Sequence, residues 1–89
     1  MKALVYILYF KISGKYYVGS TNNIERRLKQ HRSGHTPSTK RLGKEFELVF
    51  SQEVTNLPLA RKAEQRIKSW KRKDYVQRII ADGKIAFLE

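Results

Sequence analysis

Residues 15–31, KYYVGSTNNIERRLKQH, run from a strand-like segment through a cluster of helix-capping residues into a basic, helix-like segment. The first five of them are mostly aromatic or β-branched, which favours an extended strand. Residues 20–23, STNN, offer side-chain oxygens that can cap the first turn of a helix. Ile24 and Leu28 then recur at helical spacing, so the sequence predicts a helix from residue 24 to about residue 33.

Two consecutive arginines on this helix are predicted to face different ways. At 100° per residue, Arg27 and His31 fall beside the apolar stripe, whereas Arg26 and Lys29 point away from it. Arg27 is therefore the arginine that the helix phase places next to the core.

An apolar run, ALVYILYF at residues 3–10, precedes this stretch and predicts a core strand. Ser13 and Gly14 separate it from residues 15–19 and indicate a hairpin turn. The run is too short to span a bilayer, and neither a basic leader nor a small-residue cleavage site accompanies it. We therefore expect a β-hairpin and no membrane segment.

The hairpin determines which face each tyrosine occupies. In an unbulged hairpin with an even-length loop, paired residues have numbers that sum to an odd value, and alternate residues share a face. Tyr6 and Tyr17 are then expected on one face of the sheet. Tyr9 and Tyr16 are expected on the other face, where half-buried packing is their predicted role.

Residues 33–45 combine Gly, Pro and hydroxylic residues with basic ones, which suits a surface loop. Downstream, Phe46, Leu48 and Phe50 alternate with other residues, which predicts a third strand with one inward face.

Two further helices are predicted. Thr55 or Asn56, followed by Pro58, opens the first one. Its apolar stripe is Leu59, Ala63, Ile67 and Trp70. After a break at residues 71–74, the apolar residues of a shorter helix are Tyr75, Val76, Ile79 and Ile80. The sequence alone assigns no structure to residues 85–88. We expect a single α+β domain, residues 1–89, with a small antiparallel sheet covered by helices.

The composition is strongly basic, because 19 Lys and Arg against 8 Asp and Glu give a formal net charge of +11. This balance favours nucleic acid as partner, ahead of an anionic membrane or a merely solvated surface. Cysteine is absent, which excludes disulfides and is compatible with a reducing compartment. We expect a cytoplasmic monomer. The basic residues predicted to contact nucleic acid are Arg26, Lys40, Arg41, Lys44, Lys62, Arg66, Lys68, Lys71, Arg72 and Lys73.

Glu64 is an isolated acid in a basic helix and borders its apolar stripe. Its carboxylate could hold a hard divalent cation, with water and a substrate phosphate as the other ligands. The alternative is an exposed ion pair with Lys68 or Arg61, worth about 0.3 kcal/mol. A zinc site is not expected, because thiols are absent and the two histidines lack metal-ligand spacing.

Other polar side chains leave two interpretations open. The guanidinium of Arg27 could hold a phosphate, or be one more basic group. Tyr6 and Tyr17 could pack in the core; as bases or nucleophiles they would need a nearby cation or a metal-bound water relay, because a tyrosine pKa is ordinarily about 10. His31 could assist proton transfer or only pack beside Leu28.

Together these segments resemble the GIY-YIG nuclease domain, and the resemblance covers residues 3–80. The matching segments, in order, are VYI (5–7), YVG (17–19), NIERRL (23–28), His31, ELV (47–49) and Ala63-Glu64. Val5 stands where the first motif has glycine, and Ser20 stands where some members have lysine. The chain is most similar in kind to the small single-domain bacterial members.

The resemblance implies a three-stranded antiparallel sheet flanked by about three helices. It also implies an endonuclease that uses Mg²⁺ or Mn²⁺ to hydrolyse phosphodiester bonds of nucleic acid, DNA ahead of RNA, with structured or branched DNA included. The residues at the matching catalytic positions are Tyr6, Tyr17, Arg27, His31 and Glu64, of which Glu64 is also the metal ligand. Tyr17 is the expected base and Tyr6 the orienting tyrosine. The alternative is a non-catalytic nucleic-acid-binding module that retains the fold.

Overall fold

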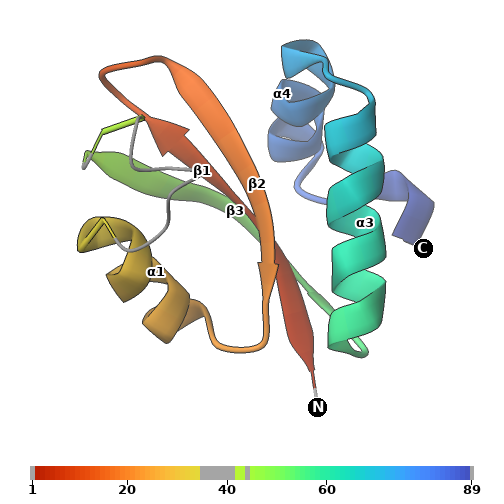
Figure 1. Cartoon of the computed structure of the whole chain (residues 1–89). Coiled ribbons are helices and arrows are strands. Elements are labelled where there is room, and N and C mark those ends of the chain that lie inside the picture. The colour runs from red at the N-terminus through yellow and green to blue at the C-terminus, as the bar shows by residue number, and fades with distance from the viewer. Residues whose placement is uncertain (1, 35–41, 44, 89) are drawn as a thin grey trace.

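The apolar run at the start of the chain forms the middle strand of a three-stranded antiparallel sheet (Figure 1). The computed structural model describes residues 2–34, 42–43 and 45–88. The strands are β1 (Ala3–Phe10), β2 (Lys15–Thr21) and β3 (Phe46–Val54), in the spatial order β2-β1-β3. The helices are α1 (Ile24–Arg32), α3 (Leu57–Ser69), α4 (Lys73–Asp82) and a short 3₁₀ helix, η1 (Ala86–Leu88). The predicted α+β class is confirmed.

Helices cover both faces of β1, which explains why its sequence is almost continuously apolar. Val5 and Ile7 belong to the core on the side of α3 and α4, and both are fully buried. Tyr6, Leu8 and Phe10 point to the opposite face, where α1 packs. Figure 1 shows the sheet between α1 on one side and α3 with α4 on the other. The fold therefore has two small cores that share one central strand.

The hairpin has the predicted parity. Tyr6 pairs with Gly19 and Leu8 pairs with Tyr17, so Tyr6 and Tyr17 share the α1 face of the sheet. Tyr9 pairs with Tyr16, and their ring centroids lie 5.1 Å apart. Both predictions about the tyrosines' faces are confirmed.

The third strand differs from its prediction. Its pairing with β1 passes from Phe50 directly to Leu48, so Val49 is an extra residue in a β-bulge. Val49 and Phe50 both pack on the α3 side, whereas Phe46 packs on the α1 side and Leu48 is 40% exposed. The predicted single inward face of β3 was wrong, because the bulge reverses the alternation of the strand.

Helix α3 begins as predicted but buries a shifted stripe. The Asn56 side chain accepts a hydrogen bond from the backbone N–H of Leu59 at 2.9 Å and caps the helix. The buried residues are Ala60, Ala63 and Ile67, while Leu59 is 43% exposed. The prediction of Leu59 as a core residue was wrong. Ala60, one position later, occupies the buried position in the first turn of α3, and Leu59 is turned toward solvent.

The end of the chain returns to the core. Gly83, at φ 74°, ends α4 in the left-handed conformation that glycine tolerates best. Ile85 then inserts into the core and is fully buried. Its backbone N–H donates to the Gln52 side-chain oxygen at 2.7 Å, which attaches this segment to β3. Nothing in the local sequence pattern indicated this long-range contact.

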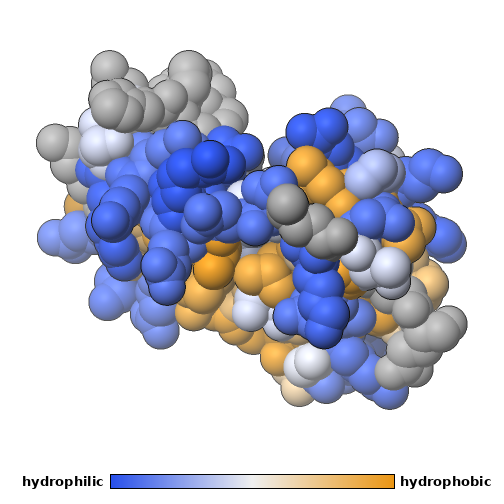
Figure 2. All heavy atoms as spheres, turned by 90° about the horizontal axis from the view of Figure 1, so that it is seen from below, coloured by the Kyte–Doolittle hydropathy of each residue, from blue (hydrophilic) through white to orange (hydrophobic). Residues whose placement is uncertain are grey.

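The surface is mixed. Figure 2, which looks from below Figure 1, shows hydrophilic side chains gathered on both flanks of that face and hydrophobic ones between them. No helix in the described part of the chain is long and apolar enough to cross a membrane. Most of the predicted loop at residues 33–45, with the predicted contacts Lys40, Arg41 and Lys44, lies outside the described residues.

Candidate active site

A polar cleft of about 470 Å³ is formed by β1, β2, the turn that follows β2, α1 and α3. Four of the predicted catalytic residues, Tyr6, Tyr17, Arg27 and Glu64, line it. The other lining residues are Ser20, Thr21, Asn22, Arg26, Leu57, Arg61 and Gln65. The fifth predicted residue, His31, does not line the cleft; it is buried and contacts Tyr6. The structure thus brings together residues that are far apart in the sequence.

Tyr6 and His31 form a buried pair. Only 1% of Tyr6 and 3% of His31 are exposed, and the Tyr6 hydroxyl and His31 Nε2 are hydrogen-bonded at 2.9 Å. Burial raises the pKa of the Tyr6 phenol above its ordinary value. Burial, and secondarily the positive charge of Arg27, lower the pKa of His31 to about 4. Near pH 7 the pair is therefore an uncharged phenol bonded to an uncharged imidazole.

Gly19 is the residue that makes room for the Tyr6 ring. A Cβ atom at position 19 would lie 2.5 Å from both Cζ and the hydroxyl oxygen of Tyr6. No other residue type fits there without moving the ring. The glycine of the YVG segment is thus explained by contact with the tyrosine on the neighbouring strand.

Tyr17 is the tyrosine that remains accessible. It is half-buried, and its ring centroid lies 6.3 Å from that of Tyr6 and 5.3 Å from that of His31. The Lys68 ammonium lies 4.9 Å from the Tyr17 ring centroid. A cation of the kind expected beside a catalytic tyrosine is thus present next to Tyr17.

The cap of α1 determines where Arg27 points. The Asn23 side chain accepts a hydrogen bond from the Arg26 backbone N–H at 3.1 Å, and the Thr21 hydroxyl accepts one from the Asn23 N–H at 3.0 Å. With this start, Arg27 is half-buried and Arg26 is exposed. The predicted helix phase is confirmed, although Arg26 also reaches the edge of the cleft.

Glu64 is held from two sides. Its Oε1 accepts a hydrogen bond from the Ser20 hydroxyl at 2.5 Å, and its Oε2 forms an ion pair with Lys68 at 2.6 Å. The carboxylate side chain is only 18% exposed. The ion pair predicted as an alternative role is therefore present, and the same carboxylate also lines the cleft.

The sequence analysis did not assign Ser20 or Arg61 to the site. Arg61 lies three residues before Glu64 and Lys68 four residues after it, so all three share one face of α3. This spacing could have placed Arg61 in the cleft. No sequence signal linked Ser20 to a carboxylate on a distant helix.

The remaining predicted nucleic-acid contacts lie along α3 and the connection to α4. Lys62 and Lys71 are exposed. Arg66 extends over the ring of Phe87, with its guanidinium carbon 4.5 Å from the ring centroid. Arg72 is paired with Asp74 at 2.7 Å. The Lys73 ammonium donates to the Gly14 carbonyl at 3.0 Å.

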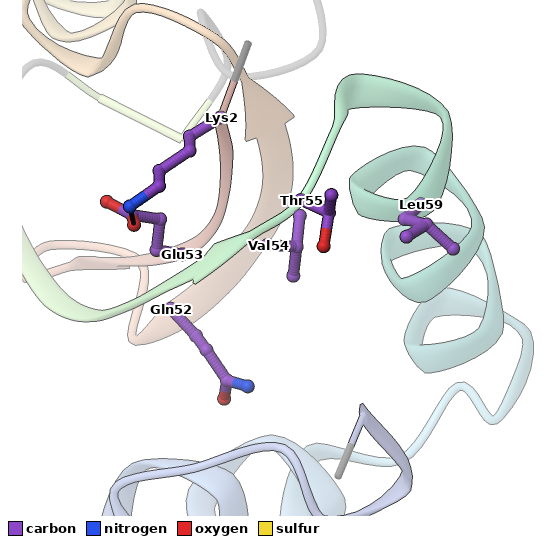
Figure 3. A pocket seen from close by; sticks show the side chains of 6 residues that line it. All are labelled: Lys2, Gln52, Glu53, Val54, Thr55 and Leu59. Atoms are coloured by element: carbon purple, nitrogen blue, oxygen red, sulfur yellow. Dashed lines mark ion pairs between the residues drawn. The ribbon is translucent and has the colours of Figure 1, made fainter.

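A separate hollow lies between the end of β3 and the start of α3 (Figure 3). In it Lys2 and Glu53 point toward one another and form an exposed ion pair at 2.9 Å. Gln52 points away from that pair, and its oxygen is already used by the Ile85 N–H. Lys2, Glu53 and Gln52 are thus engaged in structural contacts, and the polar cleft is the better candidate site.

Residues 2–78 match the model of the GIY-YIG catalytic domain. The chain is 38% identical over 71 residues to UPF0213 protein YhbQ of Escherichia coli O127:H6, covering 80% of this chain and 70% of that protein. It is 39% identical over 69 residues to the same protein of E. coli K12, covering 78% and 68%. The solution NMR structure of UPF0213 protein BH0048 from Bacillus halodurans matches with TM-score 0.58 and 31% identity, covering 93% of this chain and 87% of that one.

The contact between Gly19 and Tyr6 predicts a strong coupling. We expect Gly19→Ala to lower the free energy of unfolding by about 1 to 3 kcal/mol, because the added methyl group overpacks the Tyr6 ring. In a Tyr6→Leu background the obstructing ring atoms are gone, and the same change should cost much less. Urea unfolding of the four proteins measures the coupling. An equal cost of Gly19→Ala in both backgrounds would refute the contact.

The buried imidazole predicts a pH-dependent stability. The pKa of His31 is about 4 in the folded chain and about 6.5 when unfolded, so between these values the unfolded chain binds more protons. Stability should therefore fall as the pH drops from 6.5 to 4, by at most about 3 kcal/mol from this group. The His31→Gln variant should lack this pH-dependent part of the free energy of unfolding. Urea unfolding of both proteins at a series of pH values measures the difference. Parallel profiles for the two proteins would mean that His31 is not held neutral.

Proposed function

The chain belongs to the GIY-YIG family, and on this premise we propose that it is a divalent-metal-dependent nuclease that hydrolyses phosphodiester bonds of nucleic acid, DNA ahead of RNA. The observation that carries the proposal is the convergence of Tyr6, Tyr17, Arg27 and Glu64 on one polar cleft. Guanidinium, phenol and carboxylate groups at one place can position a phosphate and stabilise the charge that develops during its transfer.

Phosphate binding is assigned to the arginines. Arg27 is half-buried, so its guanidinium is restricted in orientation and can offer a fixed pair of N–H donors to the scissile phosphate. Arg26 and Arg61 line the same cleft, both from exposed positions, and suit contacts with neighbouring phosphates. Removal of Arg27 should thus affect the reaction, whereas removal of Arg26 should mainly affect binding.

Proton transfer is assigned to Tyr17. As the phenolate, its oxygen would accept a proton from the attacking water; Tyr17 lines the cleft, and the Lys68 ammonium lies 4.9 Å from its ring centroid. Tyr6 suits a different role. Burial raises its pKa, and its hydrogen bond to His31 fixes the phenol, so Tyr6 orients groups in the cleft while it keeps its proton.

Glu64 is the residue that would hold Mg²⁺ or Mn²⁺. In the described part of the chain, no three His, Cys, Asp or Glu side chains come together, and Glu64 is the one carboxylate that lines the cleft. This donor set fits Mg²⁺, which is commonly bound by one or two carboxylates with water and substrate phosphates. Lys68 would have to leave Oε2 for a cation to bind there. A bound cation supplies charge neutralisation at the phosphate and acidifies its water ligand.

The proposal also includes the cellular location, the oligomeric state and the substrate of the protein. The relatives named above come from bacteria, and we place the protein in the bacterial cytoplasm as a monomer that acts on DNA, structured or branched DNA included. The net charge of +11 supports a polyanionic substrate.

The proposal predicts that Glu64→Gln loses cleavage and keeps binding. We expect at least about a 100-fold lower rate with Mg²⁺ or Mn²⁺, because the amide is a poor cation ligand and loses the charge of the carboxylate. Circular dichroism and DNA affinity in EDTA should be unchanged. The readout is cleavage of single-stranded, duplex, flapped and branched DNA and RNA.

The matched control is Glu25→Gln, which removes an acid from the exposed first turn of α1 and should cleave as the wild type does. A wild-type cleavage rate in the Glu64→Gln variant would show that Glu64 takes no part in the reaction. Binding by the wild type with no cleavage of any substrate would favour the non-catalytic module.

A further inference from the structure

A second groove adjoins the cleft and has a different character. It has a volume of about 520 Å³ and lies between the β1–β2 hairpin and the connection from α3 to α4. Its apolar lining comes from Val18, Ile67 and Val76, together with Tyr16. Among the described residues, only Tyr17 lines both the groove and the cleft. A ligand in the groove would therefore lie next to the proposed proton acceptor.

The groove is surrounded by positive charge. Its cationic lining residues are Lys15, Lys68, Lys71, Arg72 and Lys73, and no acidic residue lines it in the described part of the chain. Lys15 and Lys71 are exposed, so their ammonium groups are available to a ligand. An apolar floor with a cationic rim fits a ligand that has flat apolar faces and a regularly spaced anionic backbone.

The backbone at Lys71 gives an independent reason to assign a role to the groove. Lys71 has φ 49°, the one left-handed conformation at a residue other than glycine in the described chain. A side chain is disfavoured there, and glycine or asparagine is the usual choice just after a helix. The chain nevertheless has a lysine whose side chain lines the groove. Strained residues of this kind are concentrated at functional sites.

We propose that this groove binds an unpaired segment of the nucleic-acid strand whose phosphodiester bond lies in the adjacent cleft. The bases of a duplex are stacked on one another, so only phosphates of a duplex could reach the groove and its apolar floor would stay unused. An unpaired base can lie on the tyrosine-lined floor while its phosphates meet the lysines. This deepens the proposed nuclease function by naming its substrate class, a strand with an unpaired segment.

Binding without cleavage tests the groove. Fluorescence anisotropy in EDTA would compare a labelled oligothymidine strand with a duplex of the same length, for wild type and Lys71→Gly. Glycine removes the ammonium and suits the left-handed backbone, so the variant should be at least as stable in urea. We expect the wild type to prefer the single strand, and Lys71→Gly to weaken single-strand binding about fivefold with a smaller effect on the duplex.

Lys29→Gln is the control, because it removes the same charge from an exposed position on α1 that lines neither the groove nor the cleft. Tyr16→Leu should also weaken single-strand binding, by about fivefold, since it removes a stacking surface. Equal losses for Lys71→Gly and Lys29→Gln, or a wild-type preference for duplex, would overturn the inference. Groove-dependent binding without any cleavage would instead overturn the nuclease proposal alone.

Discussion

The hydrogen bond between Tyr6 and His31 is the contact on which the rest of the site depends. It joins the central strand to α1 in the interior, where both groups are removed from water. The Tyr6 ring in turn lies over Gly19, so three elements, β1, β2 and α1, are fixed by one side chain. Because the pair stays uncharged near pH 7, it can be buried without a counter-ion.

A second connection crosses to the other face of the sheet. Ser20 at the end of β2 donates to Glu64 on α3, and Lys68 completes the contacts of that carboxylate. The edge strand β2 also carries Tyr17, whose ring centroid lies 4.9 Å from the same Lys68 ammonium. At position 20 this chain has a serine, and the ammonium group near Tyr17 comes from Lys68 on α3.

The periodicity of the sequence predicted which face of a strand or helix each side chain occupies. The hairpin parity placed Tyr6 and Tyr17 on one face, and the helix phase placed Arg27 beside the core. Contacts between distant segments could not be predicted in this way. The β-bulge at Val49 has no signature in the local sequence, yet its extra residue reverses which side chains of β3 face each side of the sheet. The Ser20 hydroxyl meets a carboxylate 44 residues away, which only the packing of α3 on the sheet determines.

We propose that the Glu64 carboxylate in this cleft is the place where a divalent cation and a phosphate meet. The most direct test is the broadening of backbone amide NMR signals by substoichiometric Mn²⁺, mapped along the folded chain. We expect the broadening to be strongest around Glu64 and Ser20, whose side chains line the cleft and are hydrogen-bonded to one another. Broadening centred on Glu53 in the separate hollow, or none above the level seen in Glu64→Gln, would contradict it.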